Sequence, residues 1–337
     1  MDVSIIIVNY KTPELVIDCV NSIKEKTLDL EYEIIIVDNA SSDHSVSIIK
    51  ENVSDEVLLI ESDKNLGFGK ANNLGAKYAS GKYVFLLNSD TLLINNAIKI
   101  LFDYLEQNPN IGIAGGNLYT MERRPSSSYC TEFDDIISVK ADAKWSIIIK
   151  NIFMNRYIDR KYSGEQKERF YYKSNFNFTD QVQKVAYVFG TDMMLLRELY
   201  ENVGGFDPDF FMYAEEEELS WRITQKGYQI VNVPTAKIIH YDGASVKKDA
   251  RFSVRQYSMR LNGTFMYYFK RFKEQGVHEC YHYKLLKFNR VLKIGKLFHR
   301  TKLVELTKQQ KECLKEVYVQ FLNEQKIGGG KEYGRSK

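Results

Sequence analysis

The first 115 residues alternate between short, continuous apolar runs and stretches in which apolar residues recur every three or four positions. Continuous runs predict strands that are covered on both faces, and the three-to-four spacing predicts amphipathic helices. The runs lie at residues 4–9, 33–38, 57–60, 82–87 and 111–115. The helices are expected at residues 12–23, 45–50, 67–79 and 95–107. Strands that alternate with helices predict an α/β fold, with a parallel sheet flanked by helices on both faces.

The pattern changes near residue 117. Residues 118–180 are polar, rich in aromatic residues and weakly periodic, so we expect an irregular segment there, with residues 146–158 as its candidate helix. Regular patterns then resume, with strands expected at 185–190, 193–197, 230–233 and 237–240 and a helix at 219–226. Beyond residue 250 the chain is expected to be helical. We therefore predict a first domain at 1–245 and a helical C-terminal extension at 246–337.

The composition is that of an ordinary globular protein. Hydrophobic residues make up 44% and charged residues 27% of the 337 residues, which is enough chain for one large domain and an extension. Apolar stretches stay below the roughly 18 residues that cross a membrane, and the N-terminus enters a strand without a signal peptide. The four cysteines show no CxxC spacing, which argues against a zinc site or a disulfide framework and fits a cytoplasmic protein.

The formal net charge of +3 conceals an uneven distribution. Residues 265–311 contain 12 Lys or Arg against 3 Glu, so the rest of the chain is acidic. A basic segment of this kind predicts either an anionic partner, such as a membrane surface, or a solvated helical face. Both interpretations remain open from the sequence, and nothing in it points to nucleic acid.

Polar residues terminate three of the predicted strands. Asn9, Asp38 and Asn88 end these runs, and Asp90 follows two residues later. In open α/β sheets, ligands bind at the carboxyl ends of the strands, and carboxylates there suit a hard divalent cation that carries phosphates. The alternatives are local: Asp90 could cap the next helix, and Asp38 opens a run of turn-forming residues.

A glycine-containing segment, residues 65–73, precedes a predicted helix. Small residues at a helix start allow an anion to approach the backbone. The segment lacks GxGxxG and Walker A spacing and follows the third strand, which disfavours a dinucleotide-binding dehydrogenase.

Two further features could carry chemistry. Residues 215–218 are four consecutive glutamates between apolar and aromatic stretches. They are either a solvated helix start or a site where apolar surroundings raise the basicity of an acid, as a general base requires. His240, near the end of a predicted strand, is either a structural residue or, with a neighbouring carboxylate, a metal ligand.

In this order, these segments resemble the family 2 glycosyltransferases, which have the GT-A fold, and in particular bacterial rhamnosyltransferase-type enzymes of O-antigen and capsule synthesis. The resemblance spans about residues 3–245. The matching segments are residues 4–10, 38–43, 65–69, 87–91, 204–207 and 211–216, together with His240.

The resemblance implies roles for individual residues. Asn9 and Asp38 would contact the nucleotide, and Asn65, Gly67 and Asn72 would line the donor pocket. Asn88 and Asp90 stand at the family's DXD motif, where Asp90 would hold Mg2+ or Mn2+ on the donor diphosphate, with His240 as a further ligand. Glu215 and Glu216 occupy the position of the family's Glu-Asp pair, whose second acid is the catalytic base.

This sequence departs from the family at two positions: Asn88 replaces the first acid of the DXD motif, and Glu216 is longer by one methylene than the usual Asp. The first change predicts weaker metal binding. The second predicts a different acceptor geometry, or a base role for a neighbour such as Glu217. A non-catalytic binding module and a sugar-nucleotide pyrophosphorylase are the alternatives, although the segment after the first strand lacks a pyrophosphorylase's basic, glycine-rich signature.

The reaction that the resemblance implies is an inverting transfer from a dTDP- or UDP-linked sugar to a saccharide or polyprenyl-linked acceptor. Residues 118–180 and the sheet edge near Asp192 are expected to form the acceptor region. The basic C-terminal segment would then contact the inner face of the membrane, or serve as a helical cap or homodimer interface.

Overall fold

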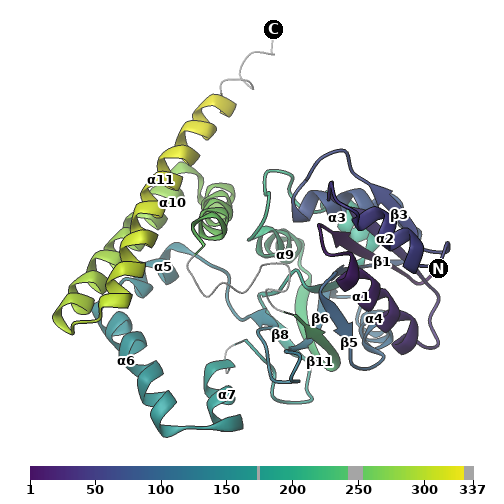
Figure 1. Cartoon of the computed structure of the whole chain (residues 1–337), viewed down its shortest axis with the longest axis horizontal. Coiled ribbons are helices and arrows are strands. Elements are labelled where there is room, and N and C mark those ends of the chain that lie inside the picture. The colour runs from purple at the N-terminus through teal and green to yellow at the C-terminus, as the bar shows by residue number, and fades with distance from the viewer. Residues whose placement is uncertain (173–174, 242–252, 330–337) are drawn as a thin grey trace. The chain divides into compact units, whose positions relative to one another are not determined.

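The computed structural model describes residues 1–172, 175–241 and 253–329. The chain forms two compact units, shown in Figure 1. The sheet unit comprises residues 1–133, 163–211 and 215–249, and the helical unit comprises residues 134–162, 212–214 and 250–337. The predicted boundary between residues 245 and 246 lies outside the described residues and stays a prediction.

The sheet unit is built on a mixed sheet that is nine-stranded in the described part of the chain, with β3-β2-β1-β4-β10-β6-β11-β5 in order and β8 paired to β11. The first four strands in this order, from β3 to β4, pair in parallel, as the sequence predicts. The strands are β1 (Val3–Asn9), β2 (Tyr32–Asp38), β3 (Leu58–Glu61), β4 (Tyr83–Asn88), β5 (Thr91–Leu93), β6 (Ile111–Tyr119), β8 (Gln183–Val185), β10 (Asp192–Leu196) and β11 (Gln229–His240). A separate ladder pairs β7 (Tyr129–Cys130) with β9 (Tyr187–Val188).

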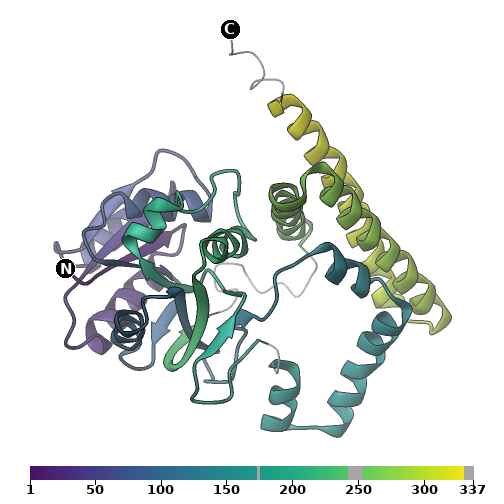
Figure 2. The same cartoon turned by 180° about the vertical axis from the view of Figure 1, so that it is seen from behind.

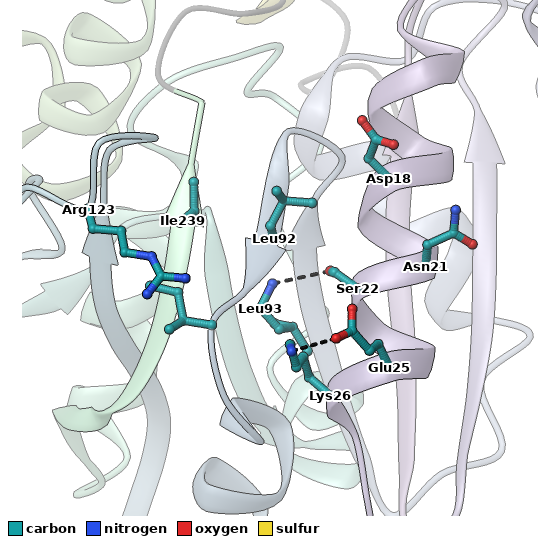
Figure 3. A pocket seen from close by; sticks show the side chains of 10 residues that line it. Asp18, Asn21, Ser22, Glu25, Lys26, Leu92, Leu93, Arg123 and Ile239 are labelled. Atoms are coloured by element: carbon teal, nitrogen blue, oxygen red, sulfur yellow. Dashed lines mark hydrogen bonds and ion pairs between the residues drawn. The ribbon is translucent and has the colours of Figure 1, made fainter.

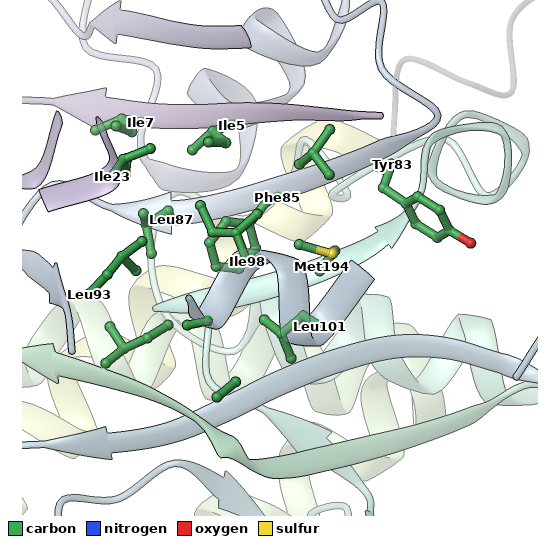
Figure 4. Close-up of a cluster of buried hydrophobic side chains, with 14 of the residues drawn as sticks. Ile5, Ile7, Ile23, Tyr83, Phe85, Leu87, Leu93, Ile98, Leu101 and Met194 are labelled. Carbon is green, nitrogen blue, oxygen red and sulfur yellow. The ribbon is translucent and has the colours of Figure 1, made fainter. Parts of the chain in front are cut away.

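Helices cover both faces because side chains alternate along each buried strand. Ile5 and Ile7 of β1 face one cluster of buried side chains, and Ile6 faces the other. Figure 4 shows part of the first cluster, which includes Phe85 and Leu101. The first face is packed by α1 (Pro13–Lys26), α2 (Ser45–Asn52) and α4 (Ala97–Gln107), and the second by α3 (Phe68–Ala76), α8 (Arg197–Asn202) and α9 (Glu215–Gln225).

The local expectations for β11 and α9 differ from the structure. Two short strands were expected near the end of the sheet, but β11 is continuous, with a register shift against β6 between Asn232 and Lys237. Pro234 lies in this interval and cannot donate to the ladder. Helix α9 begins at Glu215 rather than at residue 219, because acids are favoured in a first helical turn.

The segment 118–180, expected to be irregular, contains three helices: α5 (Ile136–Asp142), α6 (Trp145–Lys161) and α7 (Gly164–Tyr172). The first begins at a capping box made by Asp135 and Ser138. The candidate helix at 146–158 corresponds to α6, whereas α5 and α7 were not expected from the sequence.

The helical unit contains α5, α6, α10 (Val254–Leu297) and α11 (Thr301–Gly329), which confirms the prediction of C-terminal helices. Helix α10 is broken at Lys273, where φ is 59°. Helices α10 and α11 lie side by side, as Figure 2 shows from behind. Stacking of Tyr281 on Tyr318, with ring centroids 3.8 Å apart, and an edge contact of Phe265 with Tyr318 contribute to this packing.

Candidate functional site

The carboxyl ends of β1 and β2 meet in a buried hydrogen-bond network. Parallel pairing places Asn9 beside Asp38, and the Asn9 Nδ2 donates to Asp38 Oδ1 over 2.7 Å. Ser41 donates to the same carboxylate through its hydroxyl (2.5 Å) and its backbone N–H (3.0 Å). The turn chemistry that the sequence offered as an alternative for Asp38 is therefore present, and it holds the carboxylate in one orientation at the sheet edge.

Asn39, which the sequence interpretation did not single out, connects this edge to the glycine-containing loop. Its side-chain oxygen accepts from the Leu66 N–H over 2.8 Å. Its amide nitrogen donates to Asn65 Oδ1 and to the Gly67 carbonyl, each over 3.2 Å. Its place in the sequence, directly after the acid that ends a strand, could have singled out Asn39, because an amide side chain there can reach a neighbouring loop.

Gly67 lies where no side chain fits. Its φ is +80°, and a Cβ atom built there would lie 2.0 Å from the Phe211 carbonyl oxygen. The next residue, Phe68, donates its N–H to that oxygen over 3.0 Å. The amide of Asn72, which is buried, is engaged within α3 by donating to the Phe68 carbonyl. The loop is thus held close to the segment that precedes α9.

Asp90 and His240 lie together although 150 positions separate them in the sequence. Antiparallel pairing of β5 with β11 places His240 opposite Thr91, and the Tyr241 N–H donates to the Asp90 carbonyl. The His240 Nε2 lies 3.3 Å from Asp90 Oδ1. The helix-cap interpretation of Asp90 is wrong, because β5 intervenes and Asn96 occupies the cap of α4.

The Asp90–His240 pair fits two ligands of one divalent cation. Two ligands at right angles on an ion with bonds of about 2.1 Å lie about 3 Å apart, close to the observed separation. Among the described residues, no group of three or more His, Cys, Asp or Glu could hold a metal. A six-coordinate ion would therefore take most of its ligands from bound phosphate and water, as Mg2+ commonly does.

One cysteine, Cys19, lies beside the end of β4, with its Sγ 3.8 Å from the Asn88 carbonyl. Cys19 is fully buried, with its Sγ 3.5 Å from the Thr91 hydroxyl. Burial raises the pKa of this thiol to about 12, so it stays protonated.

The four consecutive glutamates differ in accessibility. Glu215, Glu217 and Glu218 are buried, whereas Glu216 is partly exposed. The interpretation as a fully solvated helix start is therefore wrong. Burial raises the pKa of Glu215 well above its usual range, and the charge of Glu216 raises it further. The neutral form of Glu215 is therefore favoured, and Glu216 is the most exposed acid of the run.

Gly190 lies next to both Phe68, at the start of α3, and Glu216. A Cβ atom at Gly190 would lie 3.1 Å from the Phe68 ring and 3.8 Å from the Glu216 Cβ. The next residue after Gly190, Thr191, accepts a hydrogen bond from the Asn88 N–H over 2.9 Å. This short path links Glu216 to the end of β4, so the acid and the DXD position belong to one region.

An arginine fixes the helix that carries Glu216. Arg222 forms a two-point contact with Glu218, with its Nε 2.7 Å from Oε1 and its Nη2 2.8 Å from Oε2. It also donates to the carbonyls of Val203 and Gly205. These bonds fasten the first turns of α9 to the 203–205 turn.

Asp192 does not lie on an exposed edge as the sequence interpretation expected. Its side chain is fully buried between β4 and β6, and its Oδ2 accepts from the Gly116 N–H over 2.6 Å. Burial raises its pKa well above the usual range. Asp192 cannot touch an acceptor and is a structural residue.

A pocket of about 440 Å³ lies elsewhere on the sheet unit, between α1 and β5 (Figure 3). Asp18 and Asn21 from α1, Leu92 from β5, and Arg123 are among its lining residues. It contains none of the residues predicted to bind donor or metal, and the chemistry assigned to the strand edge does not depend on it.

Comparison with known proteins identifies the family. The model of "Glycosyl transferase family 2" matches residues 4–204, more than half of the chain. The chain belongs to glycosyl transferase family 2. The matched range contains the Asn9–Asp38 network, the glycine-containing loop and Asp90.

Two relatives illustrate the range of similarity to this family 2 member. The O-antigen biosynthesis protein RfbC of Myxococcus xanthus is 23% identical over 249 residues, which are 74% of this chain and 18% of that protein. The low-salt glycan biosynthesis hexosyltransferase Agl10 of Haloferax volcanii is 25% identical over 244 residues, or 71% of this chain and 67% of that protein. The chain thus spans less than a fifth of RfbC.

Solved structures show that this family 2 chain has the GT-A fold. The structure of GalNAc-T7 with UDP, GalNAc and Mn2+ has a TM-score of 0.59 and 16% identity, covering 91% of this chain and 54% of that one. The mannosyltransferase PcManGT from Pyrobaculum calidifontis, in complex with GDP-Man and Mn2+, has a TM-score of 0.56 and 17% identity, covering 95% of this chain and 86% of that one.

Proposed function

We propose that the protein is a metal-dependent, inverting glycosyltransferase that moves a sugar from a nucleoside-diphosphate sugar to a saccharide or lipid-linked acceptor in surface polysaccharide synthesis. One observation carries this proposal: the Asp90–His240 pair lies next to the carboxyl end of β4, in the same region as Glu216. At that end Asn88 is hydrogen-bonded to Thr191, and the preceding residue, Gly190, lies beside Glu216, the partly exposed acid. Such an edge would provide a place for a diphosphate and a base for an acceptor.

The donor would lie along the carboxyl ends of β1, β2 and β4. Asn9 and Asp38 would contact the nucleoside, and Asn65, Gly67 and Asn72 would shape the pocket beside it. Asn39 would hold this loop in place through its three hydrogen bonds. Nucleotides bound to the similar GT-A structures, UDP and GDP-Man, support a nucleotide-sugar donor. Rhamnose, linked to dTDP or UDP, is the first donor sugar to test.

Asp90 and His240 would hold Mg2+ or Mn2+. When bound, the ion would offset the negative charge that grows on the departing nucleoside diphosphate. Asn88 would contribute a neutral oxygen where the family usually has a carboxylate, so we expect weaker metal affinity than a two-acid motif gives. Mn2+ in both similar structures supports a divalent ion.

Glu216 would act as general base. It would take the proton of the acceptor hydroxyl as that oxygen attacks the anomeric carbon from the side opposite the leaving diphosphate, which inverts the configuration. The raised pKa of Glu215 favours its neutral form, which would avoid a second negative charge beside Glu216. The extra methylene of Glu216 relative to Asp would place its carboxylate closer to the acceptor.

The test is donor turnover by purified full-length protein, screened with nucleoside-diphosphate sugars, Mn2+ and oligosaccharide or polyprenyl-linked acceptors. Glu216→Gln should lower kcat by about 10²–10⁴-fold while donor binding by calorimetry is unchanged. Glu217→Gln is the matched control, because its side chain is buried next to the proposed base. Asp90→Asn should weaken binding of nucleoside diphosphate only when Mn2+ is present.

Two results would contradict the proposal. If Glu216→Gln turns over as fast as the unaltered protein, Glu216 is not the base. If nucleotide-sugar binding occurs without transfer to any acceptor, and none of these variants changes it, the protein is a binding module.

A further inference from the structure

One end of the helical unit combines exposed apolar side chains with a concentration of cations. We call it the junction surface, because the start of α6 meets the turn between α10 and α11 there (Figures 1 and 2). Its residues are Trp145, Ile149 and Lys150 of α6, and Lys293, Lys296, Leu297, Phe298, Arg300 and Lys302 around the turn.

Packing joins these two distant segments into one surface. The Arg290 guanidinium lies 5.4 Å from the Trp145 ring centroid and donates to the Ala143 carbonyl. The rings of Phe153 and Phe298 meet edge to face at 5.1 Å. The Arg300 guanidinium lies 5.2 Å from the Phe153 ring. The surface is therefore preorganised by contacts inside the helical unit.

The apolar members face solvent. Leu297 is 72% exposed, Phe298 51%, Ile149 45% and Trp145 41%. Single exposed apolar residues are ordinary, but these four large ones lie on two segments that pack against each other. Such features mark contact sites.

Cations greatly outnumber anions around these side chains. Residues 284–311 contain nine Lys or Arg and a single Glu, and residues 144–161 contain five Lys or Arg and a single Asp. Within the described chain, Lys293, Lys296 and Lys302 form no ion pair. Their ammonium groups are available to an external anion.

We propose that the junction surface docks the protein peripherally on an anionic lipid bilayer, with lysines on the headgroups and Leu297, Ile149 and Trp145 entering the interface. Basic residues combined with exposed Trp and aliphatic side chains are the pattern of interfacial binding. A nucleic acid would use the cations but give the aliphatic side chains no partner. No helix in the described residues is long and apolar enough to cross a membrane.

The experiment is co-sedimentation of the full chain with vesicles of phosphatidylcholine alone, or of phosphatidylcholine with about 30 mol% of the anionic lipid phosphatidylglycerol. We expect binding to the anionic vesicles that weakens with salt. The combined change Lys293→Gln, Lys296→Gln and Lys302→Gln should weaken it roughly 100-fold, since each cation near the surface contributes about fivefold. The matched control changes Lys77, Lys184 and Lys226, three exposed lysines of the sheet unit, to Gln and should bind as before.

The apolar contribution is tested separately. Leu297→Ser should weaken vesicle binding about tenfold, whereas Val319→Ser, at a residue of α11 that is 57% exposed, should not. In a Trp221→Phe background Trp145 is the remaining tryptophan, and its emission should shift to the blue on anionic vesicles.

Three results would overturn the proposal: equal binding to neutral and anionic vesicles, an unchanged affinity in the lysine variant, or Trp145 emission that vesicles leave unaltered. Binding to a single-stranded RNA homopolymer that is tighter than vesicle binding and lost in the same variant would also overturn it. Vesicle binding is measured without donor or acceptor, so its failure is distinct from failure of the transfer reaction.

Discussion

Replacement of Asn39 by Ala tests how the donor loop is held. The change removes one acceptor and two donor interactions, to the Leu66 N–H, Asn65 Oδ1 and the Gly67 carbonyl. Each hydrogen bond stabilises the fold by about 1 kcal/mol net. Asn39 is only 4% exposed, so water replaces these bonds poorly. We expect a loss of about 2–3 kcal/mol of the free energy of unfolding.

The loss should also appear in donor binding. Without Asn39 the loop must be ordered again whenever donor binds, so we expect the donor KM to rise about 10–100-fold with kcat nearly unchanged. Calorimetry should show the melting temperature of the sheet unit lowered by roughly 4–10 °C. Steady-state kinetics with saturating acceptor measure the KM.

Asn96→Ala is the matched control. Asn96 also exchanges two hydrogen bonds, with the backbone of Leu28, but on a connection far from the donor edge. It should lower stability slightly and leave the donor KM unchanged. If Asn39→Ala has a normal KM and melting temperature, or if both variants raise KM equally, Asn39 does not hold the loop.

Three further changes test the packing behind the site. Asp192→Asn should make the protein more stable than the original at pH 8 and similar to it near pH 4. Because the folded-state pKa of Asp192 is raised, the unfolded chain loses this proton first as pH rises, and the original protein loses up to about 1.4 kcal/mol of its free energy of unfolding per pH unit. Urea titrations at each pH would measure this loss. Arg222→Met should cost about 3–5 kcal/mol, because Glu218 is left buried without its partner; urea unfolding measures it. Gly67→Ala should abolish donor binding in calorimetry, because its Cβ would meet the Phe211 carbonyl, whereas Gly227→Ala, at an equally left-handed glycine with open space around it, should bind donor normally.

Each of these three has a result that contradicts its reasoning. A stability gain of Asp192→Asn that is the same at every pH would show that its ionisation is not involved. A fully stable Arg222→Met would mean that the contact with Glu218 is solvated. Equal donor binding by both glycine variants would show that the close approach of the loop to Phe211 is relaxed on binding.

The sequence by itself determined the elements whose signals are local. The apolar runs that end at Asn9, Asp38 and Asn88 predicted β1, β2 and β4 and placed their polar ends at one edge, because parallel strands share a carboxyl edge. Periodic helices between them required a sheet covered on both faces. Order and spacing of these segments were sufficient for the resemblance to the family 2 glycosyltransferases.

Tertiary structure alone decided what comes together at that edge. Strand β10 inserts antiparallel between β4 and β6, which buries Asp192 and brings Thr191 to Asn88. Pairing of β11 with β5 brings His240 to Asp90. Folding also leaves Glu216 partly exposed while its three neighbouring glutamates are buried, a difference that four identical adjacent residues do not reveal in the sequence.

The same reason explains why the junction surface could not be read from the sequence. The basic C-terminal segment was visible as a charge run, but Trp145 and Ile149 lie some 140 residues earlier, in a stretch without clear periodicity. Strand patterns and helix caps depend on neighbours along the chain, whereas pairing order, burial of a charge and the joining of distant segments depend on contacts between residues far apart in the sequence. The chain's local pattern therefore fixed its family and its sheet edge, and long-range packing fixed which side chains that edge and that surface present.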